Sequence, residues 1–271
     1  MKPTLAALAK SSRVATILAS MVLAGTLVSG NSVVLADDGV VLYKTGFERP
    51  LFVDDQPVAG QGGWFAKYSP AAGIISRREA ASGHQDLEVN AADLDLITAF
   101  GYYGGVYRPE QNNPIGDLSQ TPHVLFQVDV RLDGDLTPPA KVGDLMSANF
   151  SVVNPVGLLA EIYISSDGNI WSDDADGLYE FGQPERLGRY HRLGLDLNYR
   201  TGTLTFYVDG EKLGSKPIAG IVAQSTLFKI NLIVNGAPND PVHFPDYNYA
   251  SYVAHFDNLL IVTIQDEDEE N

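Results

Sequence analysis

Residues 188–210, GRYHRLGLDLNYRTGTLTFYVDG, carry the clearest structural signal in the chain. Every second residue from Leu204 to Val208 is apolar, and a period of two is the signature of a half-buried strand. Thr201-Gly202 and Asp209-Gly210 interrupt the pattern with residues that tolerate a positive φ, and Asp-Gly is among the strongest signals for a tight hairpin. The stretch therefore predicts two consecutive β-hairpins.

The same alternation of apolar and polar residues recurs at residues 124–131 and 228–234. Residues 255–264 are apolar on both faces, which predicts a strand in the middle of a sheet. Between residues 37 and 264, no helical period of apolar residues persists for three turns,. The sequence thus predicts an all-β fold in which two antiparallel sheets pack as a jelly-roll β-sandwich.

The hairpin stretch resembles a conserved element of the concanavalin A-like lectin and glucanase superfamily, especially its laminin-G and pentraxin branch. In that family an aromatic-His pair opens one strand, as Tyr190-His191 does here, and a Tyr-Val-Asp-Gly element closes the next. Further elements resemble the order seen in bacterial extracellular members: residues 45–48, 62–64, 82–89 and 256–259. The resemblance covers nearly all of residues 37–264 and implies a jelly roll. The superfamily contains lectins, glucanases, polysaccharide lyases and structural domains, so the resemblance defines architecture rather than activity.

The first 36 residues have the pattern of a cleaved signal peptide. Basic residues precede an apolar run over residues 14–28, and Val34-Leu35-Ala36 supplies a small-residue cleavage site before Asp37,. The alternative is a retained membrane anchor, but the run is shorter than the ~20 apolar residues that a membrane span needs. We therefore expect a secreted or extracytoplasmic protein whose mature chain has no integral membrane segment.

The composition indicates one acidic domain. Residues 37–264 fit a single large β domain, and residues 265–271 are too charged to pack, which predicts a disordered acidic tail. The chain has 18 basic and 34 acidic side chains, a net charge of −16, so nucleic acid and anionic membranes would be repelled. Cysteine is absent from the sequence, which excludes thiol catalysis and thiolate zinc sites.

The sequence lacks the motifs of the enzymes that use this fold. Retaining glucanases of the superfamily carry Glu-x-Asp-x-x-Glu or Glu-x-Asp-x-Glu on one strand, and neither spacing occurs here,. A polysaccharide lyase needs a Tyr or His base and a group that neutralises a uronate carboxylate. Residues of these types occur without the recognisable lyase strings around them: His84, Gln85, Tyr102, Tyr103, Tyr107 and Arg108.

The resemblance also implies a structural calcium ion. In related extracellular jelly rolls an acid of the first strand and one of the last hold the ion, and Glu48 and Asp257 match these positions,. Asn258 would face the other way if its strand is regular. The alternative is that both acids are ordinary hydrogen-bonded residues. Residues 173–177 have a calcium-loop composition but lack the flanking ligands, so we interpret them as a polar surface loop.

A non-catalytic binding module, with a glycan as its partner, fits these observations best. Aromatic rings stack on the apolar faces of sugars, while nearby polar groups bind the hydroxyls. The predicted ligand-binding residues lie in turn-rich or glycine-rich stretches: Trp171, Asp173, Tyr102, Tyr103 and Tyr107. Trp64 is expected in the core, and Trp171 could alternatively cap a sheet. A secreted lyase or glycoside hydrolase and a structural or adhesion protein of the envelope remain open, and the pattern defines no oligomeric state.

Overall fold

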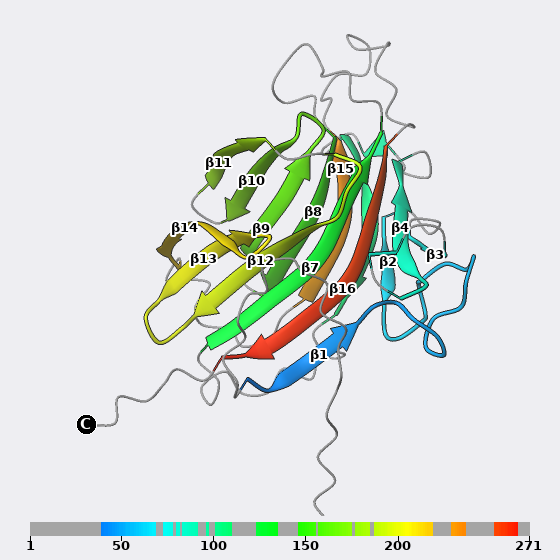
Figure 1. Cartoon of the computed structure of the whole chain (residues 1–271), viewed down its shortest axis with the longest axis horizontal. Coiled ribbons are helices and arrows are strands. Elements are labelled where there is room, and N and C mark those ends of the chain that lie inside the picture. The colour runs from blue at the N-terminus through cyan, green and yellow to red at the C-terminus, as the bar shows by residue number, and fades with distance from the viewer. Residues whose placement is uncertain are drawn as a thin grey trace, which may run out of the picture. The chain divides into compact units, whose positions relative to one another are not determined.

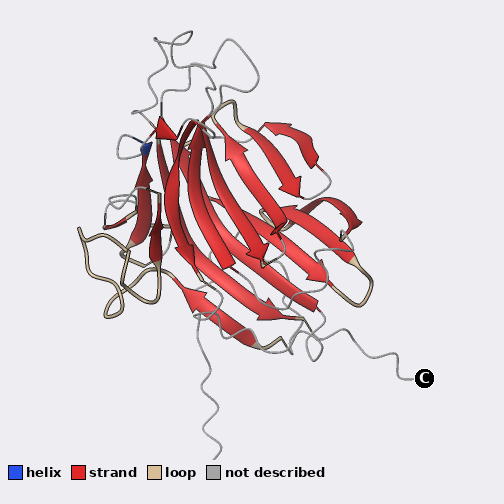
Figure 2. Cartoon of the chain, turned by 180° about the vertical axis from the view of Figure 1, so that it is seen from behind, coloured by secondary structure: helices blue, strands red, loops and turns tan. Residues whose placement is uncertain are grey.

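The computed structural model describes one body of β-strands. Its described residues are 39–68, 73–77, 80–81, 83–91, 96–97, 101–109, 123–134, 146–155, 157–174, 177–184, 187–218, 229–236 and 252–264. Strands dominate these residues (Figure 2), which contain no α-helix; the short blue segment in the figure is a 3₁₀ turn at Ala91. Accordingly, this part of the chain has no helix that could span a membrane. The predicted signal peptide and acidic tail lie outside the described residues.

The first sheet has the strand order β14-β13-β12-β7-β16-β4-β3, and β1 also pairs with β16 (Figure 1). All of its pairs are antiparallel. Its strands are β1 (Val41–Thr45), β3 (Ile74–Ser76), β4 (Asp86–Asn90), β7 (His123–Asp133), β12 (His191–Asn198), β13 (Thr203–Val208), β14 (Glu211–Pro217) and β16 (Val253–Thr263).

The second sheet has the order β11-β10-β9-β8-β15-β6-β2, with β5 paired to β6. It too is antiparallel throughout. Its strands are β2 (Phe65–Lys67), β5 (Leu96–Ile97), β6 (Gly101–Arg108), β8 (Met146–Asn154), β9 (Gly157–Ser165), β10 (Asn169–Asp174), β11 (Gly177–Pro184) and β15 (Lys229–Gly236). The predicted two-sheet antiparallel β-sandwich is confirmed.

The stretch that predicts the fold forms β12, β13 and β14 as two consecutive hairpins. Asp209 and Gly210, between β13 and β14, have φ values of 50° and 85°, the left-handed conformation that a two-residue hairpin turn requires. The prediction of a central strand is also confirmed, because β16 pairs with β7 on one side and with β4 and β1 on the other.

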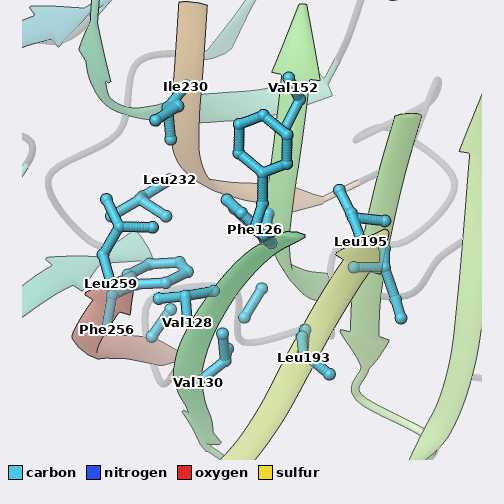
Figure 3. Packing of buried hydrophobic residues seen from close by; sticks show 14 of the residues in the cluster. Phe126, Val128, Val130, Val152, Leu193, Leu195, Ile230, Leu232, Phe256 and Leu259 are labelled. Carbon is cyan, nitrogen blue, oxygen red and sulfur yellow. The ribbon is translucent and has the colours of Figure 1, made fainter. Parts of the chain in front are cut away.

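The core lies between the two sheets. Figure 3 shows Phe126 and Val128 of β7 together with Val152 of β8 and Leu232 of β15 in one cluster of buried side chains. Fully burying one such side chain contributes roughly 1.5–3 kcal/mol, so the alternation of each strand is fixed by its inner face. Trp64 is completely buried in this core, as predicted. The outer face of each sheet is left for other side chains.

Candidate functional site

The outer face of the second sheet carries two rows of polar and aromatic side chains. The residues of each row are direct partners across successive strands. The first row is Asp173, Glu161, Ser151, Asn231, Tyr107 and Phe65, from β10, β9, β8, β15, β6 and β2. The second row, in the same strand order, is Trp171, Tyr163, Asn149, Ile233, Gly105 and Lys67. We call these two rows the polar-aromatic face.

Three of the predicted ligand-binding residues lie on this face: Trp171 and Asp173 of β10 at one end, and Tyr107 of β6 four strands away toward the other end. The expectation that they occupy loops is wrong, because Trp171 and Asp173 lie in β10 and Tyr107 lies in β6. The physical reason is that Ile170 packs into the core and fixes the alternation of β10 despite its polar composition.

Tyr102 and Tyr103 also belong to β6, where their backbones pair with β15. Their side chains lie outside the described part of the structure, so their predicted role in binding stays a prediction. Residues 173–177, interpreted from sequence as a surface loop, instead begin with the last two residues of β10.

Sequence reasoning missed Glu161, Tyr163, Asn149, Asn231 and Lys67. A signal for them exists in the alternation itself, because β8, β9 and β15 are central strands whose outward positions carry amide, hydroxyl and carboxyl groups. Asn149 and Asn231 are only 2% and 1% exposed. Buried polar residues on the outside of a sheet are informative, since burial of such groups is costly unless they are hydrogen-bonded.

Aromatic rings lie at both ends of the face. Trp171 and Tyr163 are direct cross-strand partners and are both half-buried. The indole Nε1 of Trp171 is buried and has no hydrogen-bond partner among the described residues. At the other end, the rings of Tyr107 and Phe65 stack with centroids 5.6 Å apart. The face therefore presents aromatic surface at two places, separated by a polar centre.

A glycine lies within the second row between Ile233 and Lys67. Gly105 has a φ of 151°, and a Cβ there would lie 2.2 Å from the backbone oxygen of Leu232. Only glycine fits this approach of β6 to β15. The consequence is a position on the face without a side chain, next to the polar centre.

A hydrogen-bond network holds the polar centre in place. Ser147 Oγ donates to Asn149 Oδ1 at 2.6 Å, and Asn149 Nδ2 in turn donates to Glu161 Oε1. Asn231 Nδ2 donates to Ser151 Oγ at 2.9 Å. The Oδ1 atom of Asn231 is buried without a hydrogen-bond partner among the described residues. These hydrogen bonds hold the side chains of Asn149 and Asn231 in place, and Asn231 Oδ1 is left as a buried acceptor that they do not use.

The acids and the lysine of the face have shifted pKa values. Burial raises the pKa of Glu161 to about 7, and the neighbouring carboxylate of Asp173 adds to the shift, against the hydrogen bond from Asn149. Burial also raises the pKa of Asp173, opposed by Lys216. Burial and the charge of Lys229 lower the pKa of Lys67 to about 8. Such pKa shifts cluster at functional sites, because a functional site also brings partly desolvated charged groups close together.

The lyase candidates whose side chains the structure describes do not assemble into one site. Arg108 is buried, donates to the backbone oxygen of Gly62 and lies 4.1 Å from the ring centroid of Tyr43. It is therefore committed to packing. His84 and Gln85 line an open pocket of about 740 Å³ whose lining includes neither Tyr107 nor any other residue of the polar-aromatic face.

The predicted metal pair is brought together around one glycine. A Cβ on Gly46 would lie 3.3 Å from Asp257 Oδ1 and 3.6 Å from Glu48 Cγ. Glu48 Oε1 accepts hydrogen bonds from the backbone N–H groups of His84 (2.6 Å) and Gln85 (3.1 Å). Asp257 is completely buried, and its Oδ1 accepts from the backbone of Asn258 at 2.7 Å.

The strand is irregular at Asn258, so the condition under which Asn258 would face away from Asp257 is not met. The pairing of β16 shifts register between Asp257 and Leu260, and Asn258 has a φ of 49°. This bulge directs Asn258 Nδ2 to Asp129 Oδ2, at 2.9 Å. Within the described ranges, three or more His, Asp or Glu side chains never group as a metal site. A calcium ion at Glu48 and Asp257 would therefore need backbone oxygens as well, and it stays a prediction.

Comparison with known proteins defines the class of this chain by structure. An endo-β-1,4-glucuronan lyase from Trichoderma reesei superposes with a TM-score of 0.54 at 13% identity, over 83% of this chain and 96% of the lyase. An alginate lyase from Pseudomonas aeruginosa gives a TM-score of 0.48 at 14% identity, over 70% of this chain and 86% of that chain. The binding domain of botulinum neurotoxin serotype C1 gives 0.49 at 11% identity, over 85% and 50%.

Some similar structures are much longer than this chain, which spans 18% of a sialidase. No family model and no curated protein matches the sequence. At these identities the likeness shows the fold alone: the chain has a jelly-roll-like β-sandwich. Membership of the concanavalin A-like superfamily, which the sequence suggests, remains a prediction.

Proposed function

We propose that this chain is an exported glycan-binding protein and that its polar-aromatic face holds the sugar. The observation that carries the proposal is the cross-strand pair Trp171–Tyr163, which lies beside a row of amide, hydroxyl and carboxyl groups. Flat rings of this kind can stack on the apolar face of a pyranose, and the neighbouring polar groups can bind its hydroxyls. Export rests on the predicted signal peptide.

The dimensions of the face support an extended ligand. From β10 to β2 it crosses five strand spacings of about 4.8 Å, or roughly 24 Å. Aromatic rings at both ends and hydrogen-bonding groups between them suit a chain of sugars rather than a compact molecule. The similar glucuronan lyase is named for its action on a polysaccharide, which agrees with this choice of ligand.

The charge of the protein favours a neutral glycan. The net charge is −16, and Glu161 and Asp173 lie on the face itself, so an anionic polysaccharide would be repelled at the Trp171 end. Lys67 and Lys229 extend from the other end of the face, and the charge of Lys67 also acts on Glu161.

Substitution of Trp171 tests the proposal. Trp171→Ala should abolish retardation in gels that contain the bound polysaccharide, with laminarin, xylan, galactomannan and alginate as the probes. It should leave the thermal unfolding curve nearly unchanged, because the ring is half-buried on an outer face. If Trp171 instead caps a sheet as core, the same substitution costs about 3–5 kcal/mol.

Tyr179→Ala is the matched control, because Tyr179 is an exposed aromatic residue of β11 whose backbone pairs with Ser172 rather than with the residues of the polar-aromatic face. This variant should bind as the wild type does. A stable Trp171→Ala variant with unchanged retardation would refute the proposed site. Failure of the wild-type protein to bind any glycan on an array would favour a structural or adhesion role instead.

A further inference from the structure

We propose that Glu161 and Asp173 form a carboxyl pair that hydrolyses a glycosidic bond of a neutral polysaccharide held on the polar-aromatic face. This inference rests on the proposed glycan binding and adds a reaction to it. The sequence favours a non-catalytic module in part because it lacks two acids at the right spacing on one strand. These two acids lie on neighbouring strands.

The geometry of the pair follows from its register. Asp173 of β10 and Glu161 of β9 are direct partners in an antiparallel ladder, and both side chains project from the outer face. Directly paired residues have Cβ atoms about 4.5–5.5 Å apart. Retaining glycosidases separate their two carboxyl groups by about 5–5.5 Å. Two acids on such a cross-strand pair project from adjacent positions, so their carboxyl groups can approach to the separation that the single-strand motif provides.

The sugar platform lies directly beside the pair. Trp171 lies two residues before Asp173 on β10, and Tyr163 lies two residues after Glu161 on β9. The four side chains therefore form one block on two neighbouring strands. A pyranose stacked on the aromatic pair would extend its glycosidic oxygen over the acids. The aromatic pair and the carboxyl pair are thus adjacent because side chains two residues apart on a strand lie on the same face. Their proximity does not depend on the conformation of a loop.

The two acids differ in environment, as acid and nucleophile must. Glu161 is held by Asn149 and Ser151 of β8 and faces Asp173 of β10, Lys67 of β2 and Tyr163 of its own strand. With its pKa raised to about 7, it keeps its proton in mildly acidic solution. Burial raises the pKa of Asp173 too, and the charge of Lys216 opposes this shift. Two carboxyl groups in different surroundings can take the two catalytic roles.

Two buried polar atoms point to a ligand independently of the acids. Asn231 is 1% exposed, lies in the same row as Glu161 and Asp173, and has an Oδ1 atom without a partner among the described residues. Trp171 Nε1, next to Asp173, is likewise buried and unpartnered there. A buried group without a partner is costly, and a sugar hydroxyl can accept from the indole or donate to the amide oxygen.

The reaction balances without any further reagent. Glu161 donates its proton to the glycosidic oxygen as the bond from that oxygen to C1 breaks, and a carboxylate oxygen of Asp173 bonds to C1. Glu161, now a carboxylate, takes a proton from water, whose oxygen attacks C1 and releases Asp173. One water is consumed, one new reducing end forms, and both acids return to their starting states.

The experiment measures binding and product together. Full-length secreted protein is incubated with laminarin, mixed-linkage β-glucan, xylan, galactomannan, alginate and polyglucuronate. Gel retardation reports binding, reducing ends report hydrolysis, and ultraviolet absorbance reports the double bonds that a lyase would create. We expect reducing ends without double bonds from a neutral polysaccharide that is bound, at a rate that falls as the pH rises through about 7 because Glu161 loses its proton.

Glu161→Gln and Asp173→Asn should each lower the rate at least about a hundredfold while retardation stays within a few-fold of wild type. Glu211→Gln, an exposed acid of β14 in the other sheet, is the control and should change neither. The two near-isosteric variants are tested separately, so a failure of one to fold leaves the other.

Binding of a polysaccharide without release of reducing ends from it would overturn the hydrolysis and leave the glycan-binding function standing. A Glu161→Gln or Asp173→Asn variant with wild-type rate, or products with new double bonds, would also overturn it. If no probe is bound and none is cut, both the binding and the hydrolysis are contradicted.

Discussion

The outer faces of the two sheets are both polar, but they use their polar groups differently. On the first sheet, Arg192 donates to both carboxylate oxygens of Asp129 at 2.7 and 2.9 Å. His255 Nδ1 and Nε2 lie 2.8 Å from Asp86 and 3.4 Å from Asp133. On the second sheet, Glu161 and Asp173 form no ion pair within the described residues. Charges that neutralise one another stabilise the fold, whereas an acidic, aromatic surface with unused hydrogen-bonding atoms is suited to a ligand.

The largest effect should come from breaking the charge network of the first sheet. Asp86 is completely buried and accepts from Tyr190 Oη at 2.6 Å as well as from His255. Asp86→Asn leaves the His255 charge without one of its partners, so it should lower the free energy of unfolding by about 3–5 kcal/mol. Urea denaturation measures this loss. If the folded variant is still retarded in glycan gels, the charge network of the first sheet serves stability and not binding. If retardation is lost, binding on the second sheet depends on the first sheet.

The same network predicts how stability depends on pH. Burial disfavours the charged form of His255, but hydrogen bonds to Asp133 and Asp86 outweigh it and raise the pKa to about 9. Because this pKa is raised, protonated His255 stabilises the fold fully below its unfolded pKa of about 6.5. This stabilisation is lost as the pH rises toward 9. Unfolding free energy should thus fall by about 3 kcal/mol over this window. His255→Gln should reduce this dependence of the unfolding free energy on pH. If the variant keeps the wild-type dependence, other groups cause it.

Calcium removal tests a third region, where the first and last strands meet. An ion held by Glu48 and Asp257 only in the folded state would stabilise it by roughly 2.7 kcal/mol at a hundredfold excess over the dissociation constant. Chelation should then lower the melting temperature, and Asp257→Asn should remove this response. A melting curve that excess chelator leaves unchanged, for protein shown to be metal-free, would leave the two acids as hydrogen-bonded residues.

The smallest effect should have the opposite sign. The pKa of Glu161 is raised from 4.5 to about 7, so its ionisation in the folded state costs stability as pH rises through this range. Glu161→Gln should therefore raise the free energy of unfolding at pH 8 by about 1–2 kcal/mol, allowing for partial exposure. Gain of stability with loss of function is typical of an active-site residue. A destabilised variant would make Glu161 a structural residue like Asp86.

The fold could be predicted because it depends on local patterns. The alternation from Leu204 to Val208 and the Asp209-Gly210 turn define β13 and its hairpin without knowledge of any distant residue. Asn258 shows the limit of this reasoning, because its bulge depends on the pairing of β16 with β7 and not on local composition.

The site could be predicted only in part. Trp171, Asp173 and Tyr107 stand out as residue types that bind sugars, but their place on one face depends on the register of five strands. Glu161 and Asp173 become a pair only when β9 and β10 align. A motif search along one strand cannot detect a constellation that is built across two.

Tryptophan fluorescence tests the central claim, that the polar-aromatic face binds the glycan, most directly. The chain has two tryptophans; Trp64 is completely buried in the core, and Trp171 lies half-buried on the face. A saturating amount of a bound polysaccharide should shift the emission to shorter wavelength and protect Trp171 from quenching by acrylamide. Emission and quenching that stay unchanged while the polysaccharide is demonstrably bound would place the ligand elsewhere and contradict the account.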